Sequence, residues 1–297
     1  MKLTSTRPRD LFYVDWWLMN HNSWKVSYQH EILHANNIQL PYYKDCERFV
    51  DQATAFAAKR NLKTSISFTG GEVTEWPDFD DLLAYCKSQQ VKTSFVTNLN
   101  LPLPRFQRLL AHTDNLLVEV HPGYTNTSHL LFALYKIKEA SISVTVNINM
   151  TLELWDDMIA LHETLNEKFP ELPINKKMLF KDPIFNTAPQ DYDQEQAEQL
   201  KAQHGDILIE SDQGREYTDA QTLILEQRNK FVGYQCWAGI EQVVVDAWGA
   251  VHRGHCRKSG FMGYLKDQEL YWHPEPLICA LPACVNQFDL LATKQSI

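Results

Sequence analysis

The chain has little of what marks several large classes of protein. It carries 28 Lys and Arg against 37 Asp and Glu, which gives a formal net charge of -9 at pH 7. Non-specific nucleic-acid binding depends on clustered Lys and Arg that displace counterions, so this balance argues against it. The same deficit of positive charge disfavours an anionic membrane surface. No apolar run reaches the ~20 residues that span a bilayer.

Three motifs of common enzyme classes are also missing. There is no G-x-S-x-G, no phosphate-loop pattern and no G-x-G-x-x-G, so hydrolase-elbow and nucleotide-motor functions have no support. The start, MKLTSTRPRDLFYVDWW, lacks the continuous apolar core of a secretory signal. We therefore expect a cytoplasmic protein in a reducing compartment, where clustered cysteines more often bind metal than form disulfides.

What is present is an alternation of strand-like and helical runs. The 297 residues are 44% hydrophobic and 22% charged, which is typical of a soluble globule with a sizeable core. The patterns predict strands at 12–20, 64–71, 92–98, 115–122, 142–150 and 175–181, and helices at 44–60, 77–90, 103–112, 128–140 and 152–169. Six β/α-type steps imply parallel strands with right-handed crossovers, hence a barrel or a doubly wound sheet. In such folds the sites lie where strands end.

The rhythm ends after Asp182. Segment 183–233 is polar and partly helical, and 243–254 reads as a hairpin turning near Gly249. The sequence therefore predicts three parts of the chain: a barrel over 1–185, a helical connector over 186–232 and a cysteine-rich metal-binding extension over 233–297.

Four cysteines crowd the last quarter of the chain: Cys236, Cys256, Cys279 and Cys284. Thiolates are soft donors, and four converging sulfurs suit zinc or an iron–sulfur cluster. A disulfide pair and a set of unrelated core cysteines remain open as alternatives.

The stretch SFTGGEVTEWPDFDDLLAYCKSQQVKTSFVTN, 67–98, resembles the radical S-adenosylmethionine (SAM) superfamily. It is similar to that family's second strand, its GGE turn, a following helix and a third strand ending in TN. The resemblance implies that Gly70, Gly71 and Glu72 hold the amino group of SAM. The residues alone also allow a turn that needs glycine flexibility.

A second stretch, VDWWLMNHNSWKVSYQHEIL at 14–33, resembles the loop in which that family carries three cysteines spaced C-x3-C-x2-C. The three positions fall on Asn22, Val26 and Gln29. None replaces a thiolate on iron, and Val26 has no donor atom. The resemblance therefore implies that the SAM-cleaving [4Fe-4S] cluster is lost, and with it the route to a 5′-deoxyadenosyl radical.

The C-terminal region resembles the auxiliary iron–sulfur extension called SPASM, or its shorter twitch form. There a cysteine precedes a hairpin with a glycine turn, a second cysteine follows it, and further cysteines come later. Cys236, Gly249 and Cys256 fit that order. The resemblance implies that Cys279 and Cys284 complete a four-sulfur site for a [4Fe-4S] cluster, with zinc as the alternative.

These patterns together predict a partial (β/α)6 TIM-like barrel of radical-SAM type with a small cysteine-rich extension. We expect a pseudoenzyme that binds a protein partner or serves in an assembly, with weak SAM binding or none. The alternative is an enzyme that uses the barrel pocket for SAM or another small molecule without radical chemistry. The motif HEILH, 30–34, offers a third function as a zinc hydrolase.

Smaller expectations concern single residues. Cys46 and Cys86 lie in helical runs and are predicted to be buried packing residues. His121 is expected to be a hydrogen-bonded structural histidine. Asn147 and Asn149 share one face of a strand, where they line a barrel mouth or sit at its rim.

Overall fold

The computed structural model describes residues 1–29, 33, 40–140, 142–181, 188–201, 205–257 and 260–297. Its largest element is a nine-stranded sheet in the order β13-β12-β11-β2-β3-β4-β5-β6-β7. The strands are β2 (Leu11–Met19), β3 (Lys63–Gly70), β4 (Lys92–Thr97), β5 (Asn115–Val120), β6 (Ser143–Asn149), β7 (Ile174–Lys177), β11 (Gln242–Val245), β12 (Ala250–His252) and β13 (Phe261–Tyr264). Strand β11 and strands β2 to β7 are parallel, and β12 and β13 are antiparallel.

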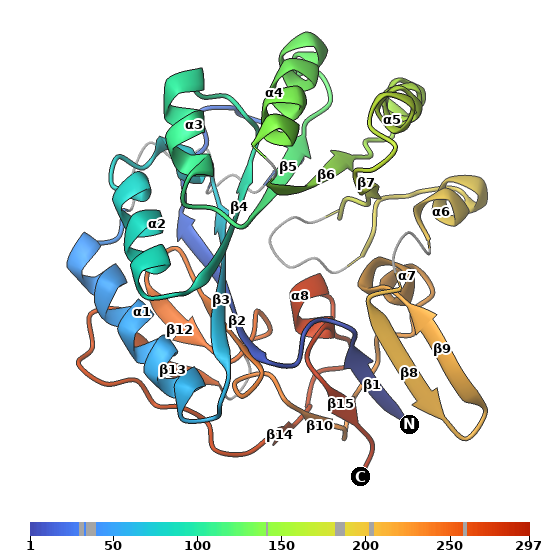
Figure 1. Cartoon of the computed structure of the whole chain (residues 1–297). Coiled ribbons are helices and arrows are strands. Elements are labelled where there is room, and N and C mark those ends of the chain that lie inside the picture. The colour runs from blue at the N-terminus through green and yellow to red at the C-terminus, as the bar shows by residue number, and fades with distance from the viewer. Residues whose placement is uncertain (30–32, 34–39, 141, 182–187, 202–204, 258–259) are drawn as a thin grey trace.

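A helix lies in each connection from β2 to β7. The helices are α1 (Tyr43–Ala58), α2 (Phe79–Ser88), α3 (Leu103–Leu110), α4 (Thr127–Glu139) and α5 (Trp155–Lys168). Figure 1 shows these helices around the outside of an arc of strands. The predicted mixed α/β fold with a parallel sheet is confirmed. Among the described strands β13 and β7 remain the two edges, so the arc does not close into a barrel.

The period of two in β2 explains how one strand serves both faces of this arc. Phe12 and Trp16 are at most 1% exposed and point to α1, where their rings meet Phe56 at 5.0 Å and Phe49 at 4.9 Å. Asp15 and Trp17, the neighbours of Trp16 in the sequence, line a cavity on the other face. Each buried aromatic side chain of this kind contributes about 2–3 kcal/mol.

Helix α1 presents an apolar stripe to the sheet. Its buried residues follow the 3.6-residue period: Cys46, Phe49, Val50, Ala53, Phe56 and Ala57. Cys86 is buried in the same way on α2. The prediction that Cys46 and Cys86 are packing residues is therefore confirmed, since both are 0% exposed.

A second, six-stranded sheet joins the two ends of the chain. Its order is β14-β10-β15-β1-β8-β9, and every pairing is antiparallel. The strands are β1 (Lys2–Ser5), β8 (Ile207–Ser211), β9 (Gly214–Thr218), β10 (Gln235–Cys236), β14 (Leu277–Ile278) and β15 (Lys294–Gln295). Figure 1 shows both termini at this sheet.

The segment predicted as a helical connector contains strands as well as helices. It contains α6 (Gln194–Leu200) and α7 (Ala220–Leu225), but β8 and β9 form a hairpin between them. Four of the five residues of β9 are exposed, so its sequence lacks the apolar alternation that marks a strand. The hairpin is held by β1, about two hundred residues away in the sequence, with Lys2 opposite Glu210.

The C-terminal region is more ordered than its loop-like sequence suggests. The predicted hairpin over 243–254 is confirmed: β11 and β12 pair, and Gly249 takes the positive φ of 76° that its turn requires. The short helix α8 (Gln287–Leu290) was not predicted. It begins at Asn286, whose side-chain oxygen accepts from the backbone N–H groups of Phe288 and Asp289.

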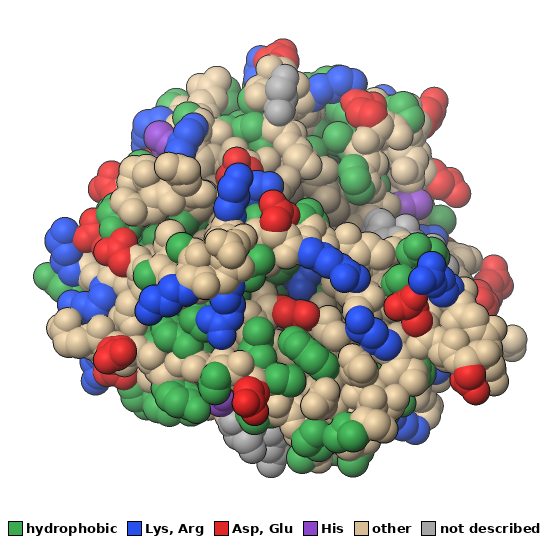
Figure 2. All heavy atoms as spheres, turned by 60° about the horizontal axis from the view of Figure 1, so that its bottom comes forward, with side chains coloured by type: hydrophobic (Ala, Val, Ile, Leu, Met, Phe, Trp, Pro, Cys, Tyr) green, Lys and Arg blue, Asp and Glu red, His purple; other side chains and the backbone are tan. Residues whose placement is uncertain are grey.

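The surface carries charged side chains of both signs, as the composition leads us to expect. Figure 2 shows basic and acidic side chains intermingled on the face that carries the lower part of Figure 1. No described helix is both long and apolar enough to cross a membrane.

Candidate functional site

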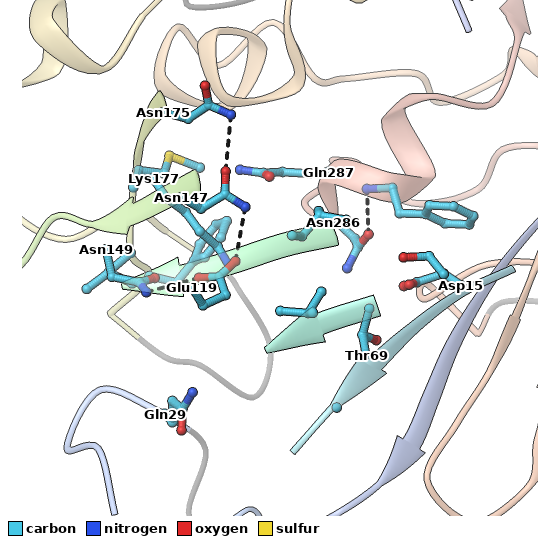
Figure 3. Close-up of a pocket in the computed structure, with 18 of the residues that line it drawn as sticks. Asp15, Gln29, Thr69, Glu119, Asn147, Asn149, Asn175, Lys177, Asn286 and Gln287 are labelled. Atoms are coloured by element: carbon cyan, nitrogen blue, oxygen red, sulfur yellow. Dashed lines mark hydrogen bonds and ion pairs between the residues drawn. The ribbon is translucent and has the colours of Figure 1, made fainter. Parts of the chain in front are cut away.

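A cavity of about 620 Å³ opens at the carboxyl ends of the parallel strands. Its walls come from the ends of β3 to β7, from the loop after β2, and from α7 and α8. Helix α8 therefore covers part of the side that an incomplete barrel leaves open, and Figure 3 shows Asn286 and Gln287 facing the ends of the strands. This is where α/β folds place their ligands.

The turn after β3 fits tightly against the end of β2. Gly70 has a φ of 118°, and a Cβ on it would lie 1.9 Å from the Trp17 ring. A Cβ on Gly71 would lie 1.7 Å from the carbonyl oxygen of His21. The N–H groups of Gly71 and Glu72 donate to the carbonyls of Met19 and His21 at 2.9 and 2.8 Å. Both glycines are thus required by close backbone approach, and both line the cavity.

Glu72 lines the cavity but its carboxylate already has three donors. One oxygen accepts from Thr74 N at 3.2 Å and from Thr74 Oγ1 at 2.7 Å, where it caps the 3-10 turn η2 (Val73–Glu75). The other accepts from Asn98 N at 2.8 Å. Burial raises the pKa of Glu72, and these hydrogen bonds oppose the rise. The glutamate therefore ties the β3 turn to the end of β4.

The three positions at which the resemblance expects cysteines lie in the loop 20–29, which we call the β2 loop. Asn22 Nδ2 donates to Gln29 Oε1 at 3.3 Å, and Asn22 Oδ1 accepts from Trp24 N at 2.9 Å. Val26 is fully buried, and its carbonyl accepts from Gln29 N at 3.1 Å. Two of the three positions are thus neighbours at the cavity wall, joined by an amide–amide hydrogen bond.

His121 belongs to an aromatic group beneath the β2 loop. Its Nδ1 lies 2.7 Å from the Tyr28 hydroxyl, and the Trp24 ring meets its edge at 6.0 Å. Burial lowers the pKa of His121 to about 4, and burial also raises the pKa of Tyr28. The neutral imidazole therefore accepts the tyrosine hydrogen bond. The prediction of a hydrogen-bonded histidine is confirmed.

A polar network crosses β5, β6 and β7 on the cavity side (Figure 3). Glu119 accepts from Asn147 Nδ2 at 3.1 Å, from Asn149 Nδ2 at 3.0 Å and from Lys177 Nζ at 2.8 Å. Asn175 Nδ2 extends the chain to Asn147 Oδ1 at 3.1 Å. Burial opposes ionisation of Glu119, but Lys177 and the other donors outweigh it and lower the pKa of this carboxyl.

Two of the five residues of this network were expected from the sequence. Asn147 and Asn149 line the cavity, which was one of the two positions predicted for them. Glu119, Asn175 and Lys177 were missed. The signal lies in register: Glu119, Asn147 and Asn175 are consecutive partners across three parallel strands, so their side chains share a face.

An ion pair links the cavity to the C-terminal region. Asp15 of β2 lies 2.6 Å from His255 Nε2. Burial disfavours the charged imidazole, but Asp15 favours it more, and the pKa of His255 is raised. The carboxylate of Asp289 accepts from the backbone N–H groups of His255 and Cys256, both at 2.9 Å. Helix α8 therefore fixes the turn that carries Cys256.

Four cysteines form what we call the cysteine cluster: Cys236, Cys256, Cys279 and Cys284. None is in a disulfide. Burial raises the pKa of Cys284, and the nearby Cys236 and Cys256 add to this while Lys294 opposes it. Cys284 is held by hydrogen bonds in both directions with Asn229, at 2.7 and 2.9 Å. Cys236 and Cys284 are 48 residues apart in the sequence, and the fold brings them near enough to affect the pKa of Cys284.

Lys294 lies beside this cluster, opposite Cys236 in the β10–β15 pairing of the sheet, and it is 1% exposed. Burial disfavours its charge, but Cys284, Cys236, Asp289 and Cys279 favour it more and raise the pKa of the ammonium. Its Nζ donates to the carbonyls of Asp289 at 2.5 Å and Ala292 at 3.2 Å.

The fit of the cluster to a metal can be tested on charge and on spacing. A buried ammonium facing sulfurs fits thiolates, which metal binding deprotonates. Among the described residues, however, no three His, Cys, Asp or Glu side chains are placed to hold a single metal ion. The described residues therefore show no preformed metal site at the cysteine cluster. Of the HEILH motif, residues 30–32 and 34 lie outside the described residues.

No model of a known protein family and no curated protein matches the chain. Solved structures do match it. SuiB of Streptococcus suis bound to S-adenosylmethionine is 14% identical with a TM-score of 0.50, over 86% of this chain and 64% of that one. SuiB bound to the precursor peptide SuiA is 15% identical with a TM-score of 0.50, over 86% and 63%. Native anSMEcpe with bound AdoMet is 13% identical with a TM-score of 0.55, over 86% and 78%.

These likenesses concern the fold. At such low identity they support a radical-SAM-like fold for this chain, as the resemblance of its second strand and GGE turn predicted. The chain spans less than two thirds of the SuiB chains that it matches.

Proposed function

We propose that this chain is a radical-SAM-like pseudoenzyme: it lacks the SAM-cleaving cluster, carries an auxiliary iron–sulfur centre on Cys236, Cys256, Cys279 and Cys284, and acts by binding or assembly. The single observation that carries the proposal is the hydrogen bond from Asn22 to Gln29. It joins two positions where the family needs thiolates on iron. Carboxamides are hard, weak ligands for iron, and the third position, Val26, has no donor atom.

The test of this proposal is the reaction that the lost cluster would start. Purified anaerobically and incubated with SAM and a strong reductant, the protein should produce no more 5′-deoxyadenosine than a protein-free control. Production that depends on the protein would refute the pseudoenzyme.

The same proposal includes weak SAM binding or none. The β2 loop has no thiolates to hold an iron that would chelate the amine and carboxylate of SAM, and the Glu72 carboxylate is engaged by Thr74 and Asn98. Titration calorimetry should therefore detect no binding at sub-micromolar affinity. Tight binding that Glu72→Ala abolishes would show instead that the GGE turn still holds an amino group.

For the cysteine cluster we propose a [4Fe-4S] centre and keep zinc as the alternative. A four-iron cluster spreads its thiolates over four iron atoms, so they stand farther apart than the four ligands of one tetrahedral zinc ion. The preference for iron–sulfur rests on the resemblance to the auxiliary extension, because no three described donor side chains are placed to hold a metal ion. Iron and acid-labile sulfide in stoichiometric amounts would support the cluster, whereas one zinc per chain would support the alternative.

A second candidate function rests on the cavity itself. Its 620 Å³ and its network around Glu119 form a preformed pocket of the size that small ligands occupy. A non-radical enzyme would use this pocket for SAM or another small molecule. Turnover of a bound small molecule without added reductant would favour it, and loss of that turnover in Glu119→Gln would locate the site.

The partner is proposed to be a protein segment. SuiB, which has a similar fold, was solved bound to its precursor peptide. The cavity of this chain reaches from the β2 loop to α8, so a partner at its mouth would contact both the barrel and the C-terminal region. The HEILH hydrolase remains a third possibility, which one bound zinc with hydrolytic activity would support.

A further inference from the structure

A second cavity lies between the loop after β4, residues 98–102, and the loop after β5, residues 121–126. It measures about 660 Å³, and its walls also include Trp24 of the β2 loop and the first turn of α4. We call it the side pocket. Asn98 lines both the side pocket and the cavity at the strand ends, whereas the other described lining residues belong to one of the two.

One wall of the side pocket is aromatic and apolar. The rings of Trp24 and Tyr124 lie 6.1 Å apart with 30° between their planes. Tyr124 is 43% exposed, although its hydroxyl is fixed by donating to the carbonyl of Lys25 at 2.7 Å. Leu101 and Pro102 also line the pocket. Such a wall suits a flat aromatic group.

Another wall is a tight turn that hydrogen bonds hold in place. Leu99 has a positive φ of 64°, and its N–H donates to Thr97 Oγ1 at 3.0 Å. Its carbonyl lies 3.0 Å from His129 Nε2. Because a carbonyl oxygen only accepts, Nε2 carries the hydrogen of this bond. The turn is therefore tied to α4, and the side pocket is preformed.

Asn98 brings an unused hydrogen-bond donor to the side pocket. It is 4% exposed, and its Oδ1 accepts from Asn100 N at 2.8 Å. In the described part of the chain its Nδ2 has no acceptor. The turn explains Oδ1 but not Nδ2, because an aspartate would make the same turn without burying an unpaired donor. A ligand that presents an acceptor atom would satisfy Nδ2.

The electrostatics of the side pocket favour a negative charge on that ligand. Helix α4 has 13 residues and no acidic residue in its first turn, so its positive end is not neutralised there. Asn126 Oδ1 caps the N–H of His129, which is one of the N–H groups that have no acceptor within the helix. The described residues that line the pocket include no Asp, Glu, Lys or Arg. A carboxylate would therefore meet donors and a positive dipole, with no acidic side chain to repel it.

We propose that the side pocket binds a small aromatic carboxylate. Its ring lies against Trp24 and Tyr124, and its carboxylate accepts from Asn98 Nδ2 near the positive end of α4. A neutral ring would leave the helix dipole unused, and an ammonium group would meet donors only. This site goes beyond the function proposed above and needs no metal, so it does not depend on the cysteine cluster.

The experiment titrates the full-length protein with benzoate, benzamide and benzylamine, which share a ring and differ in charge, and follows binding by nuclear magnetic resonance. We expect benzoate to bind with about millimolar affinity, benzamide at least about tenfold more weakly and benzylamine not at all. Tyr124→Ala removes the ring contact, and Asn98→Asp keeps the turn but places a carboxylate against the ligand. Each should weaken benzoate binding at least about tenfold. The matched control is Tyr135→Ala, a tyrosine of α4 that is 48% exposed and outside both cavities.

The proposal holds if both pocket variants weaken benzoate binding and Tyr135→Ala keeps it. No binding at about 10 mM benzoate, or equal binding of benzoate and benzamide, would overturn it. Binding that Asn98→Asp abolishes and Tyr124→Ala leaves intact would put the ligand in the cavity at the strand ends, and the proposal would again be wrong. Should Asn98→Asp not fold, the two tyrosine variants decide, and equal binding by both would reject the site.

Discussion

The β2 loop and the cysteine cluster are the two regions to which the resemblance assigns metal, and they differ in how their polar groups are satisfied. In the β2 loop the side chains of Asn22 and Gln29 bond to each other, and Val26 packs in the core. In the cysteine cluster the buried Lys294 pairs with Cys236 across the β10–β15 ladder, and its ammonium donates to the carbonyls of Asp289 and Ala292. The polar side chains of the β2 loop bond to each other, whereas none of the four cysteines of the cluster is in a disulfide.

The difference shows what a cofactor site needs when its ligand residues are replaced. A site that loses its ligands is stable only if the groups that take their place satisfy one another, because unpaired polar groups in a protein interior are costly. Residue identity already separates the two regions in the sequence, and the hydrogen bond between Asn22 and Gln29 adds that the replaced positions satisfy each other.

The largest effect should come from breaking the cysteine cluster. Cys256→Ala removes one thiolate, and we expect iron content to fall to a small fraction of wild type with the segment after residue 255 becoming sensitive to protease. Metal binding can contribute on the order of 10 kcal/mol to ordering such a segment. Iron analysis and limited proteolysis measure both effects.

Cys86→Ala is the matched control, since Cys86 is buried in α2 and does not belong to the cysteine cluster. It should keep the wild-type iron content and lose only about 1 kcal/mol of unfolding free energy through lost packing. Equal iron loss in both variants would show that general destabilisation, rather than ligation, releases the metal.

The converse change would make the two regions alike. Replacing Asn22, Val26 and Gln29 together by Cys restores the three thiolates to the β2 loop. Because Asn22 and Gln29 already lie within hydrogen-bonding distance, we expect the triple variant to bind about twice the iron of wild type after reconstitution. Unchanged iron content would mean that the loop has lost the geometry of a cluster site as well as its ligands.

A smaller loss of stability is expected from breaking the ion pair between Glu119 and Lys177. Lys177→Met leaves the Glu119 carboxylate without its cation, and Lys177 is 39% exposed, so solvent reduces the cost. We expect a loss of about 1–2 kcal/mol at pH 7 by denaturant unfolding. The double variant Glu119→Gln/Lys177→Met should recover part of it.

The pH dependence follows from the lowered pKa of Glu119. The pair stabilises the fold above the unfolded pKa of about 4.3, and this contribution is lost as the pH falls through the lower folded value. The difference between wild type and Lys177→Met should therefore shrink toward pH 3. A difference that is constant from pH 7 to pH 3 would argue that Lys177 acts through packing.

The smallest effect should come from the ion pair that joins the two regions. The pKa of His255 is raised, so the Asp15–His255 pair stabilises the fold fully below the unfolded pKa of about 6.5 and is lost as the pH rises through the folded value. Asp15→Asn should cost about 1 kcal/mol at pH 6 and less at pH 9. In a His255→Gln background the same change should cost equally at both pH values, and a pH-independent cost in the wild-type background would contradict the charged pair.

Much of the α/β arc follows from local sequence. The strands and helices between residues 11 and 177 lie where periodicity predicted them, because each buries an apolar face with a period of two or 3.6. The hairpin at Gly249 is equally local, since a glycine with positive φ fixes its turn. The six-stranded sheet could not be predicted, because its short strands pair the two ends of the chain and carry no periodic signal.

The candidate sites divide in the same way. The sequence by itself determined the residue types: carboxamides and a valine in place of thiols in the β2 loop, and four cysteines near the end. Only the tertiary structure decided that Asn22 bonds to Gln29, that Glu119 is ionised beside Lys177, and that Lys294 lies among the cysteines. The reason is physical: the free energy of a buried charge depends on every group packed around it, and those groups come from segments that meet only when the chain folds.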